Sequence, residues 1–306
     1  MSTSFIKQLS NCQCCPRECG VNRLAGETGY CGIDARVQIS YAGLHLGEEP
    51  PISGSRGSGT IFFVGCNLRC VFCQNYQISQ EYERHDVRYL TNEDLADEML
   101  KLQSCGAHNI NFVSPSHVVF QMADGIETAK RRGLTIPIVY NSNGYDSIDS
   151  LQQLRGLIDI YMPDIKYMDD ELGVRYSDVH NYTAIIPDIL DEMYQQVGNL
   201  IVDDQSIAMK GLLVRHLVLP NHLENSRRCL EVLSQISPDI FVSIMAQYSP
   251  RYKACDHPLI NRPLRASEYA EVVDYALDLG LDNAFVQELY SQKNYLPRFD
   301  RENPFD

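Results

Sequence analysis

The residues TIFFVGCNLRCVFCQN, numbered 60–75, contain the pattern that decides the fold. Thr60 to Gly65 form a short run of β-branched and apolar side chains, which is typical of a buried strand. Three cysteines, Cys66, Cys70 and Cys73, follow at once in a C-x3-C-x2-C arrangement. The pattern therefore predicts a thiol-rich loop at the carboxyl end of a strand, which is where parallel βα folds carry their functional sites.

Further apolar runs of strand length follow this loop, and segments of helical period separate them. They are NINFV at 109–113, IPIVYN at 136–141, IDIYMPDIK at 158–166, LLVRHLVLP at 212–220 and IFVSIMAQY at 240–248, with a weaker seventh run, AFVQELY, at 284–290. Thr91 and Asp94 form a capping-box-like start for the first helix. Six βα units are fewer than the eight that close a complete barrel. We therefore expect an α/β fold, a partial (β/α)6 TIM-like barrel.

The residues before the first strand have a different texture. They are rich in cysteine, glycine and proline and show little periodicity beyond a short RVQISYAGL run. We expect residues 1–59 to form a Cys-rich N-terminal extension with loops. The barrel should then span residues 60–290, and residues 291–306 should form a C-terminal tail.

Composition excludes several classes of protein. The chain has 306 residues, of which 44% are hydrophobic and 22% charged, as in ordinary globular proteins. Its net charge of −14 disfavours nucleic-acid binding. The chain lacks an apolar run of the roughly 20 residues that span a membrane, and its start, MSTSFIKQLSN, lacks a secretory signal. We therefore expect a cytoplasmic protein that binds no membrane, whose eleven cysteines serve metal, cluster or redox chemistry.

The cysteine triplet favours an iron-sulfur cluster with one open iron. A structural zinc site and an ordinary Cys₄ cluster each require four protein ligands, whereas this loop supplies three. Two other interpretations exist: Cys70 and Cys73 could form a redox dithiol, or the triplet could hold zinc together with a distant histidine. Neither explains Cys66 together with the position of the loop after a strand.

The sequence resembles the radical S-adenosylmethionine (SAM) enzymes, whose cysteine motif carries an aromatic residue where Phe72 stands. The segments GTIFFVGCNLRCVFCQN, NSNGY, DIYMPDIKY, VRHLVLP and IMAQY follow the order seen in pyruvate formate-lyase activating enzymes and their less characterised relatives. The resemblance covers most of residues 59–248. It implies an incomplete (β/α)6 barrel, a [4Fe-4S] cluster on Cys66, Cys70 and Cys73, and reductive cleavage of SAM to methionine and a 5′-deoxyadenosyl radical.

The resemblance also implies roles for residues at the other strand ends. Ser114 replaces a Gly-Gly-Glu turn that meets the methionine amino group, and Asn141 and Asn143 match a Thr-Asn-Gly-type turn. Lys166 matches the lysine of an Asp-x-Lys motif near the carboxylate, and Phe72 would contact adenine. The full set of expected cofactor-binding residues is Phe72, Ser114, Asn141, Asn143, Lys166 and Gln247, and the expected catalytic residues are Lys166 and Asp164.

Several residues at these positions allow other interpretations. The Gly-Gly-Glu turn is absent, and Gln74-Asn75 stands where characterised activases often have His-Asn, so the substrate stays open. Asn143-Gly144 could be only a turn, and Asp164 with Lys166 only an ion pair. His216 lies within an apolar run, and we expect a core histidine there.

The N-terminal cysteines predict a second metal centre. Cys12, Cys15, Cys19 and Cys31 form a C-x2-C-x3-C-x11-C pattern with Cys14 spare, in a segment too short for its own core. Zinc and an iron-sulfur cluster both match this count. The alternative is a loop of free thiols packed on the barrel.

The principal hypothesis is a radical SAM oxidoreductase, similar to the activases of glycyl-radical enzymes, that abstracts hydrogen from a protein glycine or another carbon centre. A flavodoxin or ferredoxin would supply electrons. The alternatives are a radical SAM enzyme that acts on a small molecule and a non-catalytic zinc or iron-sulfur binding protein.

Overall fold

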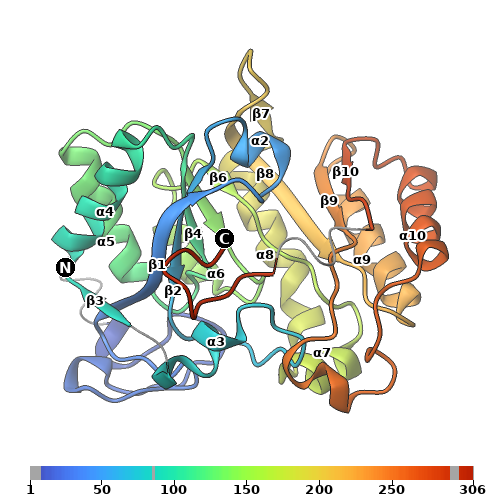
Figure 1. The fold of residues 1–306 in the computed structure, drawn as a ribbon, viewed down its shortest axis with the longest axis horizontal. Helices are drawn as coiled ribbons and strands as arrows, with labels where there is room; N and C mark the ends of the chain where they lie inside the picture. Colours follow the sequence, from blue (N-terminus) through green and yellow to red (C-terminus); the bar gives the residue numbers. More distant parts are fainter. Residues whose placement is uncertain (1–7, 85–86, 290–295, 306) are drawn as a thin grey trace.

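The structure is a computed structural model that describes residues 8–84, 87–289 and 296–305 (Figure 1). Within these ranges the strands form one ten-stranded sheet in the order β10-β9-β8-β6-β5-β4-β2-β1-β3, with β7 paired to β8. The strands are β1 (Val37–His45), β2 (Ser58–Phe63), β3 (Arg88–Leu90), β4 (Ile110–Val113), β5 (Ile138–Asn141), β6 (Ile160–Tyr161), β7 (Ile201–Val202), β8 (Ala208–Leu217), β9 (Phe241–Met245) and β10 (Ala284–Val286).

The sheet confirms the predicted partial barrel. Strands β2, β4, β5, β6, β8, β9 and β10 pair in parallel along the sheet. The antiparallel β3 and the parallel β10 end the described strand order, so the sheet does not close on itself. All six expected strands form, and the weaker seventh forms over its first three residues.

The main difference from the expected fold lies before the barrel. The expected loop segment contains β1, which pairs antiparallel with β2, so that Leu44 lies opposite Gly59. β1 buries Val37 and Ile39 and so covers an edge that β2 would otherwise expose. The extension therefore contributes a strand to the sheet in addition to its loops. The expected division at residues 59/60 and 290/291 stays a prediction, and residues 1–7, 290–295 and 306 lie outside the described part.

The fourth expected strand is shorter than the apolar run that predicted it. Only Ile160–Tyr161 forms β6, because Pro163 has no backbone N–H to donate to a neighbouring strand. Pairing resumes in an isolated bridge between Asp164 and Arg215, with Arg215 N donating to Pro163 O at 2.9 Å. This bridge places a carboxylate and a guanidinium beside each other at the end of two strands.

Helices cover the outer face of the sheet (Figure 1). They are α2 (Pro50–Ser53), α3 (Tyr76–Ser79), α4 (Asn92–Ser104), α5 (Val119–Arg131), α6 (Ile148–Gln153), α7 (Asp170–Ser177), α8 (Tyr182–Val197), α9 (Leu223–Ile236) and α10 (Ala266–Asp278). The predicted capping box of α4 forms, because Thr91 Oγ1 accepts from Asp94 N at 3.2 Å. None of the helices in the described ranges is long and apolar enough to cross a membrane.

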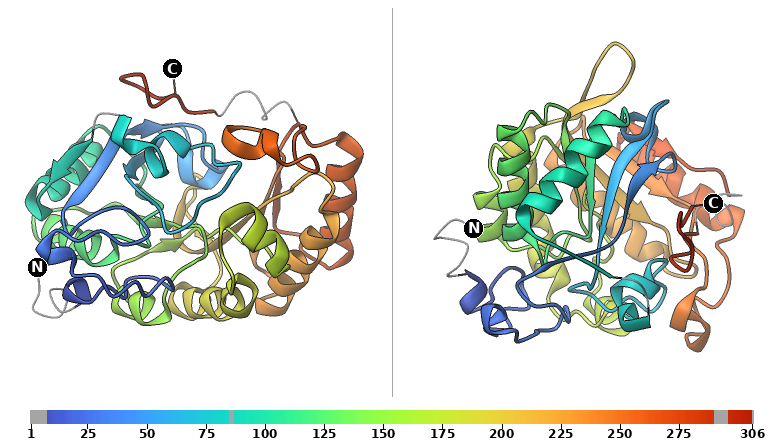
Figure 2. Two further views of the ribbon diagram at one scale, coloured as in Figure 1. Left: turned by 90° about the horizontal axis from the view of Figure 1, so that it is seen from below. Right: turned by 60° about the vertical axis from the view of Figure 1, so that its left-hand side comes forward.

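The two terminal segments contact the barrel at different places (Figure 2). The N-terminal segment lies against the loop after β2, since Arg17 Nε donates to Asn67 O at 2.9 Å. The C-terminal segment packs its aromatic rings on β1 and β2: the Phe299 and Phe305 rings lie 5.4 and 5.7 Å from the Phe62 ring. The N-terminal segment therefore borders the carboxyl end of β2, whereas the C-terminal segment also reaches His45, which pairs with the first residue of β2.

Candidate active site at the carboxyl ends of the strands

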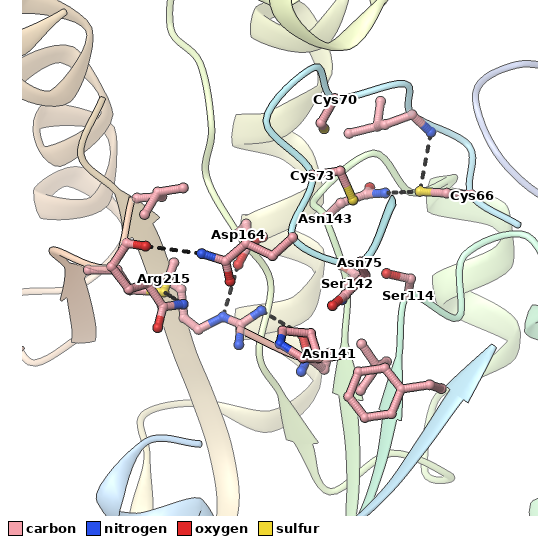
Figure 3. A pocket seen from close by; sticks show the side chains of 18 of the residues that line it. Cys66, Cys70, Cys73, Asn75, Ser114, Asn141, Ser142, Asn143, Asp164 and Arg215 are labelled. Atoms are coloured by element: carbon pink, nitrogen blue, oxygen red, sulfur yellow. Dashed lines mark hydrogen bonds and ion pairs between the residues drawn. The ribbon is translucent and has the colours of Figure 1, made fainter. Parts of the chain in front are cut away.

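An open cavity, continuous with the solvent, lies at the carboxyl ends of the parallel strands. The cavity brings together all the residues that the sequence predicts for the barrel site. They are Cys66, Cys70, Phe72, Cys73, Ser114, Asn141, Asn143, Asp164, Lys166 and Gln247. Residues up to 181 positions apart in sequence thus line one cavity because parallel strands end at one edge (Figure 3).

The cysteine loop is fixed by backbone contacts to neighbouring elements. Arg69 N donates to Ser177 O at 3.1 Å and Val71 N to Tyr176 O at 2.8 Å, both at the end of α7. The side chain of Gln74 donates from Nε2 to Gln247 O at 3.0 Å, which ties the loop to the end of β9. The loop is therefore held on both flanks rather than projecting freely.

Each thiol of the triplet has a polar neighbour. Cys66 Sγ accepts from Leu68 N at 3.4 Å and from Asn143 Nδ2 at 3.5 Å (Figure 3). Cys70 Sγ accepts from Ser177 Oγ at 3.0 Å, and Cys73 Sγ lies 3.3 Å from Ser79 Oγ. Hydrogen bonds to sulfur tune the reduction potential of iron-sulfur clusters.

Burial disfavours the thiolate forms of Cys66 and Cys73 while no metal is bound. It raises the pKa of Cys66 and raises that of Cys73 to about 12. Metal ligation replaces the thiol proton, so these positions favour a thiolate bound to the iron of a cluster over a free thiolate. In the described part of the chain, no three His, Cys, Asp or Glu side chains converge on the site of a single ion. A cluster differs from a single ion because each thiolate binds a separate iron.

The turn after β5 is built from its own polar side chains. Tyr145 N donates to Asn143 Oδ1 at 2.9 Å, and buried Asp146 accepts from Ser142 Oγ at 2.6 Å. Gly144 has a φ of 77°, and a Cβ there would clash with Asp164 O, so only glycine suits this position. Asn143 thus serves the turn and also reaches the sulfur of Cys66.

Ser114 adopts a φ of 56° directly after β4, which is unusual for a residue other than glycine. Its N–H donates to Asn141 O at 2.8 Å and joins the ends of two strands. Strained residues cluster at functional sites, because the surrounding structure must hold them in place. The position agrees with the expectation that Ser114 replaces a glycine-rich turn.

A buried charge network forms the wall across the cavity from the cysteines (Figure 3). Asp164 pairs with Lys166 at 2.6 Å and with Arg215 at 2.9 Å, and Arg215 also reaches Glu48 at 3.4 Å. Burial works to raise the pKa of Asp164, but the cations of Arg215 and Lys166 hold it below its usual range. Burial works to lower the pKa of Lys166, but Asp164 keeps it above its usual range.

Two acidic residues of this wall were not predicted from the sequence. Burial raises the pKa of Glu48 and of Glu49, in spite of the charge of Arg215. Glu49 Oε2 is buried without a hydrogen-bond partner. The pair lies in the N-terminal segment, outside the barrel motifs. Arg215 had a visible signal, since a guanidinium inside the apolar run LLVRHLVLP requires a buried partner.

The remaining predicted residues take varied roles. The Phe72 ring lines the cavity and lies 5.8 Å from the Tyr248 ring. Asn141 Oδ1 accepts from Arg215 Nη2 at 2.6 Å, so its amide is oriented by the charge network. His216 is the predicted core histidine, because it is fully buried and contacts Ile165 O and Ser226 Oγ, each at 2.8 Å.

The N-terminal cysteines line a separate, smaller cavity. Cys12, Cys15, Cys19 and Cys31 all border it, as predicted. Cys14 was expected to be spare, but it borders the same cavity with its Sγ 3.7 Å from Cys12 Sγ. The sequence pattern could not show this, because spacing alone does not fix how many neighbouring cysteines border one cavity.

Comparison with known proteins gives one family match and several relatives. Residues 60–197 match the model of the Radical SAM superfamily. The chain is 34% identical over 283 residues to the uncharacterized protein MJ0674 of Methanocaldococcus jannaschii, covering 90% of this chain and 76% of that protein. Among solved structures, Streptococcus suis SuiB bound to precursor peptide SuiA aligns with a TM-score of 0.53, 13% identity, and coverage of 78% of this chain and 51% of that chain.

A second solved structure shares the fold. HydG, a maturase of the [FeFe]-hydrogenase, aligns with a TM-score of 0.50 and 12% identity, covering 72% of this chain and 49% of that chain. Both alignments support the same barrel architecture.

Proposed function

We propose that this chain, which belongs to the radical SAM superfamily, uses a [4Fe-4S] cluster on Cys66, Cys70 and Cys73 to cleave SAM reductively and abstract hydrogen from a carbon centre. One observation carries the proposal. These three thiols border the large cavity, and no fourth cysteine of the described residues does. A cluster held by three thiolates keeps one iron for an outside ligand. The three thiols of Cys66, Cys70 and Cys73 therefore suit a [4Fe-4S] cluster with one iron open to SAM.

The bound cluster would supply the electron that breaks a carbon-sulfur bond of SAM. The chain's own residues would orient the cofactor. Lys166 presents an ammonium that Asp164 fixes at 2.6 Å, and this cation would attract the methionine carboxylate. The amide of Asn141 and the hydroxyl of Ser114 face the same cavity and would bind the polar groups of the methionine part.

Apolar side chains would keep water from the reacting centre. Phe62, Leu217 and Met245 also border the cavity, and Phe305 of the C-terminal segment adds an aromatic ring at its border. A reactive radical requires such a dry site, because water and stray C–H groups would otherwise consume it.

The motif order supports a finer proposal, that the substrate is a glycine of a partner enzyme that becomes a glycyl radical. A flavodoxin or ferredoxin would donate the electron in the cytoplasm. A small-molecule substrate would change the partner but leave the cofactor chemistry unchanged.

Anaerobic reconstitution followed by reduction tests the function. With SAM present, the reduced protein should yield 5′-deoxyadenosine and methionine, and Cys66→Ala should yield neither. Cys255→Ala is the matched control, because Cys255 is exposed and does not border the cavity. Equal product from Cys66→Ala and the unmodified protein would overturn the proposal. The presence of a glycyl-radical signal in a candidate partner enzyme after this reaction would support the finer proposal.

A further inference from the structure

Five cysteines gather around one small cavity in the N-terminal segment. Cys12, Cys14, Cys15 and Cys31 are each less than 10% exposed, and Cys19 borders the same cavity. They lie on loops rather than on one helix face, so helical periodicity does not explain the cluster. None of these cysteines forms a disulfide.

Two glycines bring these loops close together. A Cβ at Gly29 would clash with the Sγ of Cys19, so this glycine lets the exposed cysteine approach the loop that carries Cys31. A Cβ at Gly65 would clash with the carbonyl oxygen of Cys31. The segment is therefore shaped to bring Cys19 and Cys31 together beside the loop that begins at Cys66.

A buried cation adjoins the thiols. Arg23 is 1% exposed, and its Nη1 lies 3.9 Å from Cys12 Sγ and 3.7 Å from Cys14 Sγ. Its other contacts are backbone carbonyls: two bonds to Asp34 O, at 3.0 and 2.7 Å, and one to His117 O at 2.6 Å.

The charge of Arg23 lacks a carboxylate partner. No Asp or Glu of the described residues forms an ion pair with its guanidinium. Burial of a charge without a counter-ion lowers the stability of the fold by roughly several kcal/mol, whereas an anion beside the guanidinium offsets this loss. Several thiolates bound to one metal centre carry net negative charge and would balance the charge of Arg23.

A buried histidine gives a second, independent observation. His117 borders the same cavity and is 1% exposed. Its Nε2 contacts Val64 O at 2.8 Å, whereas its Nδ1 has no hydrogen-bond partner. An orphaned buried nitrogen is costly and indicates a missing ligand, water or ion.

We propose that the N-terminal cysteines bind a second metal centre, anionic and ligated by thiolates, with Arg23 as its counter-charge. The ligand is a thiophilic metal, zinc or iron-sulfur, and each ligating thiol releases its proton to solvent on binding. The thiols do not already converge on one point, so metal binding would draw these side chains together. Five thiols and His117 offer more donors than the four that either centre requires.

The position of this centre gives it a structural consequence. Arg17 donates to Asn67 O at 2.9 Å, and Arg69 donates to Tyr30 O, so the N-terminal segment contacts the loop between Cys66 and Cys70. Metal binding would order the segment that supports this loop. Loss of the second metal should therefore also lower occupancy of the first cluster.

Metal counting on two variants of the full chain tests the proposal. The variant Cys66→Ala/Cys70→Ala/Cys73→Ala should retain one centre per chain after anaerobic preparation, about one zinc or about four irons by the usual compositions of such sites. The variant Cys12→Ser/Cys15→Ser/Cys31→Ser should lose that same metal, because only three of the six donors remain. Cys105→Ala/Cys255→Ala is the control, because both residues are exposed and border neither cavity.

The outcomes separate this proposal from the proposed function. Zinc or iron in the first variant supports the second centre and identifies its metal, whatever the activity of the unmodified protein. A folded first variant with less than a tenth of one metal per chain would overturn it. If that variant does not fold, Arg23→Met decides: its metal content should fall by one centre, and an unchanged content would overturn the proposal.

Discussion

The replacement Arg215→Met should strongly destabilise the protein, because it removes the cation that the buried carboxylates share. Arg215 contacts Asp164 at 2.9 Å and Glu48 at 3.4 Å, and these three side chains are 15%, 15% and 9% exposed. Removal of one partner from a buried ion pair costs about 3–5 kcal/mol. Asp164 keeps Lys166 at 2.6 Å, and Glu48 and Glu49 can take up protons, since burial already raises their pKa values. We therefore expect a loss near the lower end, about 3 kcal/mol.

Urea unfolding of anaerobic protein with matched iron content measures this loss. Arg227→Met is the matched control, because Arg227 pairs with Glu224 at 3.2 Å on the surface, and such pairs contribute about 0–1 kcal/mol. The loss should shrink as pH falls below the ordinary glutamate pKa of about 4.3, where Glu48 and Glu49 are protonated in the folded and the unfolded chain. An Arg215→Met loss of less than about 1 kcal/mol at neutral pH would refute the reasoning.

Three further predictions test the site and its surroundings. Ser177→Ala removes the hydroxyl that donates to Cys70 Sγ at 3.0 Å, so the reduction potential of the cluster should fall in a redox titration; an unchanged potential would contradict the role of this bond. Gly144→Ala should lower the free energy of unfolding in urea by at least about 2 kcal/mol more than Gly156→Ala does. Both glycines have a positive φ, 77° and 80°, but only a Cβ at position 144 would clash with Asp164 O. Equal losses would argue against the tight turn. Burial lowers the pKa of His45 to about 4, and the centre of its ring lies 3.9 Å from the centre of the Phe305 ring. The unfolded chain therefore binds the extra proton first, and the free energy of unfolding should fall as pH drops from about 6.5 towards 4. His45→Gln should flatten this slope in urea unfolding, and an unaltered slope would exclude His45 as its source.

The strands and the residues at their carboxyl ends could be predicted from the sequence, because they depend on local sequence patterns. Thr60–Gly65 predicted β2 because a short apolar run before a loop has few other structures available to it. Cys66, Ser114 and Lys166 were predicted to meet because parallel strands end at one edge. Each of these inferences requires only residues that are close in sequence or a general rule of topology.

The parts that were missed depend on contacts across the sheet. β1 has a short periodic run, but only its antiparallel pairing with β2, from Ile39 with Phe63 to His45 with Ser58, makes it a strand. Glu48 follows β1 and meets Arg215 across the barrel end, which no motif in either segment indicates. Phe305 reaches the cavity from the other end of the chain in the same way. That Cys14 borders the same cavity as Cys15 also required the backbone path.

The central claim is that three cysteines hold a cluster with one iron open to SAM. Electron paramagnetic resonance of the reduced, oxygen-free protein tests it directly, with spectra taken before and after addition of SAM. We predict a clear change in the cluster signal on addition of SAM and loss of the signal in Cys70→Ala. A reduced cluster whose spectrum stays identical at saturating SAM would contradict the claim.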